Sequence, residues 1–228
     1  MKKIFISLVM AFMAVAMYAQ KDVTTFLGIP VDGYKPAMKQ KLISKGFVSK
    51  KLGNTEYLEG EFNGTKVHVY IVTNNKKVCR IMVCDAITLN EADIKIRFNN
   101  LVSQFNNNKR YASLKDYTLS DAEDISYEML VHNKKYEALF YQAPDIRKVD
   151  TLAIQKQVKD ELLKKYSQEQ LDNATEEITK EAQNIAMQKG MDLISKKSVW
   201  FCICEHLGKY YIAMYYDNEY NRANGEDL

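Results

Sequence analysis

The stretch Ser198–Asp217 constrains the fold of this chain more than any other segment. It contains the only tryptophan, and its pattern predicts two strands joined by a tight turn at Leu207–Gly208. Trp200 belongs to one alternation class of the first strand and Phe201 to the other, and both classes are largely apolar. Burial on both faces is typical of a strand inside a sheet rather than at its edge. We therefore expect this hairpin at the centre of a sheet.

The amino terminus has the features of a secretory signal peptide. Lys2 and Lys3 precede the apolar run Ile4–Val15. An Ala-Val-Ala cleavage motif ends at Ala16, and Ala19-Gln20 is a second possible end of the leader. The apolar run is too short for a membrane span, and no cysteine for a lipid anchor lies nearby. We expect residues 1–20 to be removed on export to the periplasm or the cell exterior, leaving a protein that is not a lipoprotein.

The remaining residues, 21–228, are predicted to form a single exported domain with a helical insertion at about 150–197. Loss of Lys2 and Lys3 with the leader leaves 30 basic residues against 29 acidic ones. A chain this close to neutrality lacks the basic patch that nucleic acid requires. No later segment approaches the roughly 20 apolar residues of a membrane-spanning helix, so we expect neither a nucleic-acid partner nor a membrane span.

The order of predicted elements favours an α+β fold. Consecutive strands joined by tight turns form antiparallel pairs, and interleaved helices cover one face of such a sheet. We expect about seven strands, a meander plus two hairpins, with helices packed mainly on one face. The expected helices are 36–45, 90–107 and two within 150–197, and the expected strands are 57–62, 66–73, 77–84, 125–131, 136–142 and the two of the central hairpin.

Local signals support several of these boundaries. Asn63-Gly64 is a strong hairpin turn signal, and Thr88 with Glu91 matches a helix capping box. Two further capping signals, Ser167 with Gln170 and Asn173 with Glu176, mark a break between the two expected helices of 150–197. The segments 132–136 and 206–210 also resemble each other, which suggests that the last two hairpins are neighbours in one sheet.

The four cysteines allow two interpretations. An even number in an exported protein permits disulfides, but Cys79 with Cys84, and Cys202 with Cys204, each lie on one strand. Neither pair has ordinary disulfide geometry, so a bridge would have to join the two strands. The interpretation that we prefer is four buried thiols that act as small hydrophobic residues.

Cys202, Cys204 and His206 alternate along one strand and are candidates for metal ligands. Thiolates and imidazole bind zinc, but the loop geometry of a zinc site is missing. The alternative is two buried thiols and a histidine at a turn. We expect no cofactor.

No sequence motif of a known catalytic site is present. There is no G-x-S-x-G, H-E-x-x-H or phosphate-binding loop. A hydrolase would have to assemble its groups from separate segments, and His132, His206 and Glu205 would be the first residues to consider. We therefore expect a non-catalytic binding or interaction module, with a secreted or periplasmic hydrolase as the alternative.

Tyrosines crowd the end of the central hairpin. Tyr210, Tyr211, Tyr215 and Tyr216 are the predicted ligand-binding residues, because tyrosine offers a rigid apolar face with a polar tip. The partner would be a protein, a peptide or a glycan. Two alternatives remain: the tyrosines are ordinary strand residues, or a sheet edge or apolar face makes a homodimer.

The chain also resembles a group of exported proteins from Bacteroidales-type gut bacteria. The segments that carry this resemblance are FLGIPVDG at 26–33, IKIRFNNLVSQF at 94–105 and YYDNEYNRANGEDL at 215–228. The resemblance implies export and a shared α+β domain, but the group has no assigned activity and supplies no site residues. In outline the order of elements is also similar to small periplasmic binding and inhibitor folds, such as the β-lactamase-inhibitor-like group.

Overall fold

The computed structural model describes residues 21–145 and 147–223, so the expected signal peptide lies outside the described residues. The chain divides into two compact units. A sheet unit comprises Val23–Ala143 and Ile194–Leu228, and a helical unit comprises Met1–Asp22 and Pro144–Leu193. Within the described part of the chain, no helix has the length and apolar character to cross a membrane.

The sheet unit confirms the α+β prediction and its antiparallel sheet. The main sheet has eight strands in the order β3-β4-β5-β6-β10-β9-β8-β7, and a separate two-stranded sheet pairs β1 with β2. All pairings are antiparallel. The strands are β1 (Thr25–Phe26), β2 (Ile29–Pro30), β3 (Val48–Leu52), β4 (Thr55–Phe62), β5 (Thr65–Asn74), β6 (Lys77–Asp85), β7 (Tyr111–Ala112), β8 (Glu137–Gln142), β9 (Ser198–His206) and β10 (Lys209–Asp217).

The hairpin predicted at the centre occupies that position. β10 and β9 are inner strands, with β6 on one side and β8 on the other. Leu207 and Gly208 form the turn with φ angles of 51° and 70°, as expected for a two-residue hairpin loop. β8 and β9 are neighbours, but the first of the two predicted neighbouring hairpins does not form, because Ile125–His132 is the helix α4.

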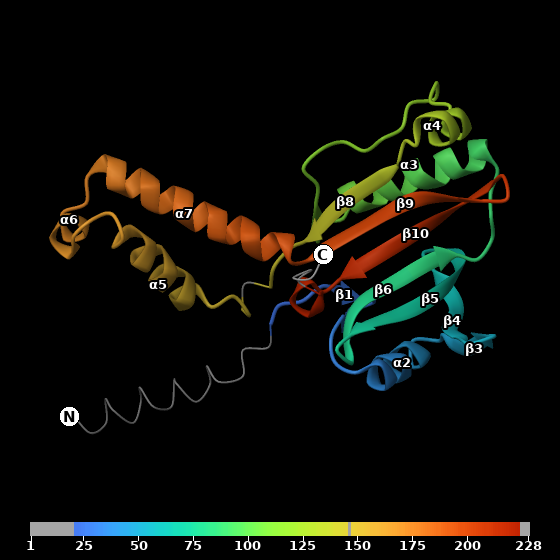
Figure 1. Ribbon diagram of the computed structural model, residues 1–228, viewed down its shortest axis with the longest axis horizontal. Helices are drawn as coiled ribbons and strands as arrows, with labels where there is room; N and C mark the ends of the chain where they lie inside the picture. Colours follow the sequence, from blue (N-terminus) through green and yellow to red (C-terminus); the bar gives the residue numbers. More distant parts are fainter. Residues whose placement is uncertain (1–20, 146, 224–228) are drawn as a thin grey trace. The chain divides into compact units, whose positions relative to one another are not determined.

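One face of the sheet, here called the covered face, packs against helices α2 (Lys35–Ile43), α3 (Glu91–Asn107) and α4 (Ile125–His132). Figure 1 shows α3 running behind β8, β9 and β10. Phe201 of β9 is fully buried there, and its ring lies 5.1 Å from that of Phe98 on α3. The predicted α3 stripe (Ile94, Phe98, Leu101, Val102 and Phe105) is buried in full. Because one continuous core joins strands and helices, the sheet holds its residues at fixed positions.

The prediction of a strand at 125–131 is wrong, because these residues form α4. Asp124 caps this helix by accepting a hydrogen bond from the Tyr127 backbone N–H, and Asn133 ends it in the left-handed conformation. Ile125 and Met129, one helical turn apart, pack into the core. The β-branched residues of the segment suggested a strand, but the caps and tertiary packing favour a helix.

Four strands and one helix cap were missed. β3 is polar and largely exposed, and β1, β2 and β7 each contain two residues, so none carries a hydrophobic pattern. The start of α3 was predicted at Thr88 with Glu91, but Asn90 is the cap and accepts from the Asp93 N–H at 2.9 Å. Lys35–Ile43 matches the first predicted helix, with Pro36 in its first turn.

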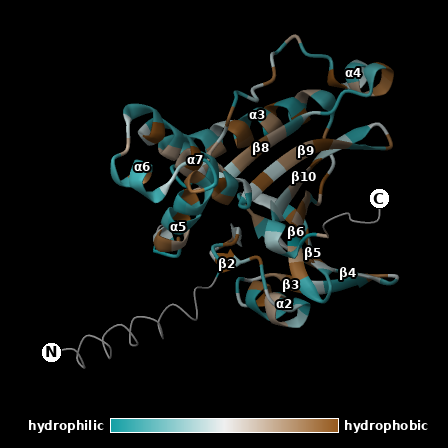
Figure 2. Cartoon of the chain, turned by 60° about the vertical axis from the view of Figure 1, so that its left-hand side comes forward, coloured by the Kyte–Doolittle hydropathy of each residue, from teal (hydrophilic) through white to brown (hydrophobic). Residues whose placement is uncertain are grey.

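Among its described residues, the helical unit contains three helices where two were predicted: α5 (Thr151–Leu162), α6 (Gln168–Asp172) and α7 (Glu176–Ser195). Ser167 and Gln170 form the predicted capping box, whereas Thr175 rather than Asn173 accepts from the first turn of α7. Figure 2 colours these helices by hydropathy. Between them lies a hollow of about 580 Å³, lined by apolar residues that include Val158, Leu171 and Ala182.

Candidate functional site

The second face of the main sheet, here called the open face, carries the candidate site. Its side chains come from the alternate positions of β5, β6, β10, β9 and β8, and most are half-buried rather than buried. They include Tyr70, Arg80, Met82, Cys84, Tyr211, Tyr215, Trp200, Cys202, Cys204, Leu139 and Tyr141. An antiparallel sheet with one face packed and one face wet normally shows polar residues on the wet side. Here that side is rich in aromatic rings and sulfur atoms.

One cross-strand row of the open face is apolar across five strands. Register places Tyr70 beside Met82, Met82 beside Tyr215, Tyr215 beside Trp200, and Trp200 beside Leu139. The rings of Trp200 and Tyr215 stack, with centroids 4.0 Å apart and planes inclined by 17°. Cross-strand aromatic pairs of this kind stabilise a sheet, and they fix the orientation of the indole.

An ion pair holds this stack from the side. Arg80 donates from Nε and Nη2 to the two carboxylate oxygens of Asp217, at 2.5 and 2.8 Å, and the indole N–H of Trp200 donates to the same carboxylate at 2.9 Å. The guanidinium carbon lies 4.9 Å from the ring centroid of Tyr215. The hydrogen bonds with Asp217 raise the pKa of Arg80. Every polar atom of the buried Asp217 side chain is therefore engaged, and the pair positions Trp200.

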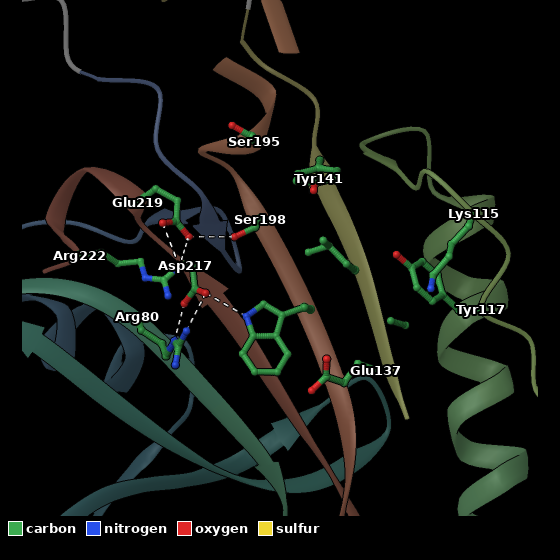
Figure 3. Close-up of a pocket in the computed structure, with 13 residues that line it drawn as sticks. Arg80, Lys115, Tyr117, Glu137, Tyr141, Ser195, Ser198, Asp217, Glu219 and Arg222 are labelled. Atoms are coloured by element: carbon green, nitrogen blue, oxygen red, sulfur yellow. Dashed lines mark hydrogen bonds and ion pairs between the residues drawn. The ribbon is translucent and has the colours of Figure 1, made fainter. Parts of the chain in front are cut away.

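A pocket of about 600 Å³, here called the Trp200 pocket, opens beside this cluster. In Figure 3, Arg80, Asp217, Glu219 and Arg222 gather on one side of the pocket, and Lys115 and Tyr117 lie on the other side. The volume is within the usual range for a small-ligand site. The lining residues are Arg80, Lys115, Tyr117, Glu137, Ala138, Leu139, Tyr141, Ser195, Ser198, Trp200, Asp217, Glu219 and Arg222.

The charges around the Trp200 pocket are balanced, because its lining contains three cations and three carboxylates. Arg80 pairs with Asp217, and Arg222 pairs with Glu219 at 2.8 Å. Lys115 and Glu137 take part in no ion pair with any described residue, and both are exposed. These two side chains are the charged groups best placed to interact with a ligand.

The four predicted tyrosines separate into two pairs. Tyr211 and Tyr215 are half-buried on the open face, whereas Tyr210 and Tyr216 point into the core and are 6% and 3% exposed. The hydroxyl of Tyr210 lies 2.8 Å from Ser126 Oγ of α4, and the ring of Tyr216 packs 4.9 Å from Phe26. Structural contacts therefore account for Tyr210 and Tyr216, and Tyr215 is the one of the four that adjoins Trp200.

All four cysteines are free thiols. Cys202 and Cys204 lie side by side on the open face with their sulfur atoms 3.6 Å apart. The hydrogen bond between them lowers the pKa of Cys204 to about 7 and raises that of Cys202, while burial raises the pKa of Cys84 to about 12. The preferred interpretation of four buried thiols holds only for Cys79, since the other three are half-buried.

Of the residues named for metal binding or hydrolysis, only Cys202 and Cys204 lie together, with their sulfur atoms 3.6 Å apart. His206 and His132 are exposed, His132 pairs with Glu128 at 3.0 Å, and Glu205 accepts from the Gly208 N–H in the hairpin turn. None of these residues lines the Trp200 pocket. Within the described ranges, no group of three or more His, Cys, Asp or Glu side chains could hold a metal ion.

Sequence reasoning missed Arg80, Asp217, Glu137 and Lys115 as members of one site. Each is an ordinary charged residue in its local segment. Arg80, Asp217 and Glu137 meet because the sheet order brings β6, β10 and β8 together, and Lys115 follows β7, which pairs with β8. The usable signal was strand alternation on β10, where Asp217 shares a face with Tyr211 and Tyr215.

Comparison with known proteins assigns no group to the chain, because no family model, no curated protein and no solved structure matches it.

Proposed function

We propose that the chain is a non-catalytic exported binding module that holds a neutral saccharide in the Trp200 pocket. The observation that carries this proposal is that aromatic rings and polar groups share the walls of one pocket of about 600 Å³. Trp200, Tyr117 and Tyr141 supply flat apolar surfaces, while Glu137, Lys115 and Ser198 supply hydrogen-bonding groups. A sugar ring presents the matching surfaces, C–H faces above and below and hydroxyls around its edge.

The charge balance of the pocket supports a neutral ligand. Equal numbers of cations and carboxylates give the lining no net formal charge, so a strongly anionic or cationic ligand gains little from the long-range field. Asp217 and Arg80 satisfy each other. Hydroxyl groups can both accept from Lys115 and donate to Glu137, which no single ionised group does.

An extended peptide added to β8 is less compatible with the structure. Short β7 pairs only with Tyr141 and Gln142, so the outer edge of β8 at residues 137–139 would be the place for strand addition. Tyr117 lies beside this stretch, because it lines the Trp200 pocket together with Glu137, Ala138 and Leu139. A strand-adding peptide would have to displace Tyr117, which packs on Phe140 with ring centroids 5.7 Å apart.

The single tryptophan provides a direct assay. Neutral oligosaccharides of glucose, mannose, galactose and N-acetylglucosamine would be titrated into the protein while Trp200 fluorescence is recorded, with calorimetry as an independent readout. We expect at least one saccharide to shift the emission and to protect Trp200 from acrylamide quenching. Glu137→Gln should weaken this ligand about tenfold or more, as expected for a lost hydrogen bond to a charged group of about 1.5–3 kcal/mol.

Glu59→Gln is the matched control, because Glu59 is an exposed strand carboxylate outside the pocket lining. It should bind the saccharide as the parent protein does. The proposal fails if no saccharide in the panel perturbs Trp200, or if Glu137→Gln and Glu59→Gln behave alike. If an unstructured peptide binds and no sugar does, the ligand of the pocket is a peptide and not a saccharide.

A hydrolase is the second candidate function, and one observation favours it: Glu137 and Glu219 line the same pocket. Glycoside hydrolysis uses two carboxylates. Chromatography of the bound saccharide after prolonged incubation separates the two functions. We expect the saccharide to be recovered intact; cleavage that Glu137→Gln abolishes would establish the hydrolase instead.

A further inference from the structure

The open face also concentrates sulfur. Met82 and Cys84 from β6 and Cys202 and Cys204 from β9 all lie on it and are all half-buried. Thiolate and thioether ligands select soft metal ions. None of these four residues lines the Trp200 pocket, although Cys202 is the cross-strand neighbour of Glu137, so the sulfur-rich part of the face adjoins the proposed saccharide site without forming part of its lining.

We propose that Cys202 and Cys204 form a two-thiolate binding site for a soft monovalent metal ion, Cu(I). Their sulfur atoms are 3.6 Å apart. Two sulfurs on opposite sides of a two-coordinate ion, each about 2.3 Å from it, are separated by about 4.6 Å. The sulfur atoms therefore have to move apart by about 1 Å, which rotation of both side chains about their Cα–Cβ bonds provides without a shift of the β9 backbone.

The same geometry argues against a disulfide between these residues. Same-face neighbours on a strand have Cα atoms about 6.6–6.8 Å apart, at the upper limit for disulfide-bonded cysteines and beyond their usual separation of about 5.5–6 Å, so a bridge would require β9 to bend. β9 is an inner strand, paired on both sides with β10 and β8, and this pairing opposes the required bend. A metal ion spans the two sulfurs where a covalent bond does not.

The ligand count favours Cu(I) over zinc. Structural zinc takes four protein ligands, and the described residues include no metal-binding group of three or more His, Cys, Asp or Glu. Cu(I) is satisfied by two or three soft ligands. Cys84 is two strands from Cys202, with Ala213 between them in the register. At about 4.8 Å per strand, its backbone lies about 9–10 Å away, so Cys84 is not a third ligand.

Binding is a ligand exchange without electron transfer. Cu(I) forms one bond to each sulfur, both S–H bonds break, and two protons are released to solvent. The product is a bis-thiolate complex with one negative charge. The copper remains Cu(I) throughout, so the site needs no oxidant or reductant beyond conditions that keep the thiols reduced.

The test is an anaerobic competition between the reduced protein and a chromophoric Cu(I) chelator such as bicinchoninate. We expect the parent protein to withdraw one Cu(I) per chain, and its native mass spectrum to show one added copper and two fewer protons. Loss of an outer-shell partner alone typically weakens metal binding about 10–100-fold. Cys202→Ser and Cys204→Ser each remove a ligand, so we expect each to bind at least about 100-fold more weakly.

Cys84→Ser and Cys79→Ser are the matched controls, and both should bind Cu(I) like the parent protein. Circular dichroism of each variant verifies folding, and the measurement on the parent protein does not depend on any variant. The site is overturned if the parent protein fails to compete, if either ligand variant retains parental affinity, or if Cys84→Ser causes an equal loss. A Cys202–Cys204 disulfide formed on mild oxidation would also overturn it. The saccharide titration is unaffected by any of these results.

Discussion

Strand β10 presents tyrosines to both faces of the sheet, and the two faces use them differently. Tyr210 and Tyr216 on the covered face are buried among helices and phenylalanines, whereas Tyr211 and Tyr215 on the open face are half-buried beside cysteines, Arg80 and Trp200. The residue type is the same, but the neighbours are supplied by different segments of the chain. A tyrosine-rich strand therefore indicates a ligand surface only after its partners on each face are known.

The largest expected difference between the faces concerns packing. Phe201→Ala should lower the free energy of unfolding by about 3–5 kcal/mol, because it leaves a cavity among buried rings. Trp200→Ala, one residue away on the open face, should cost less than half as much, since its side chain is only half-buried. Urea denaturation of both variants measures this; equal losses would show that the open face is packed as tightly as the covered one.

The second largest expected difference is in the reactivity of two thiols, Cys204 and Cys79. Because the hydrogen bond from Cys202 lowers the pKa of Cys204 to about 7, while burial raises that of Cys79, Cys204 of the metal-free protein is largely thiolate above neutral pH. Alkylation with iodoacetamide at pH 7.5 should label Cys204 about 100-fold faster than Cys79, with a rate that rises through pH 7. Cys202→Ala should move this rise to higher pH. Peptide mapping by mass spectrometry gives both rates, and a pH profile unchanged by Cys202→Ala would contradict the shared hydrogen bond.

A smaller effect is expected from the ion pair on the open face. Asp217→Asn removes the charge that Arg80 and the indole N–H share, and should destabilise the protein by about 1–3 kcal/mol. It should also shift the Trp200 emission. Glu219→Gln disturbs the more exposed pair with Arg222 and should cost less than about 1 kcal/mol. Thermal melts compare the stability of the two variants. A larger loss of stability for Glu219→Gln would show that the Arg222–Glu219 pair, and not the Arg80–Asp217 pair, stabilises the fold more.

The smallest expected effect lies on the covered side, where Glu91 of α3 accepts from Ser126 Oγ and the Ile125 N–H of α4. These hydrogen bonds lower the pKa of Glu91. Its stabilising contribution is therefore complete above the ordinary glutamate pKa and is lost as pH falls through the lowered value. Glu91→Gln should cost about 1 kcal/mol or less at pH 7 and nothing at pH 2. Chemical denaturation at both pH values tests this; an effect that grows in acid would contradict it.

Much of the fold could be read from periodicity and turn chemistry. The stripe of α3, the Asn63-Gly64 and Leu207–Gly208 turns and the capping box at Ser167 are local features, and each appears where it was predicted. The helix α4 could not be predicted in this way. Its composition favours a strand, but the packing of Ile125 and Met129 against the core favours a helix.

Only part of the candidate site could be predicted from the sequence. Tyr215 was named from composition, but Tyr210 and Tyr216 were named with it, because alternation separates faces without saying which face is covered. Arg80 and Asp217 are 137 residues apart in the chain, and no local pattern links them. Their pairing depends on β6 lying next to β10.

The sequence by itself determined the elements whose energetics are local: strands from alternation, helices from stripes and caps, and turns from Asn and Gly. It also placed the Trp200 hairpin inside a sheet, since both of its faces are apolar. Only the tertiary structure decided which face the helices cover, because that choice depends on contacts between distant segments. The same contacts gathered Arg80, Asp217 and Trp200 around one pocket, and packing against β10 and β8 held Cys202 and Cys204 on a straight strand.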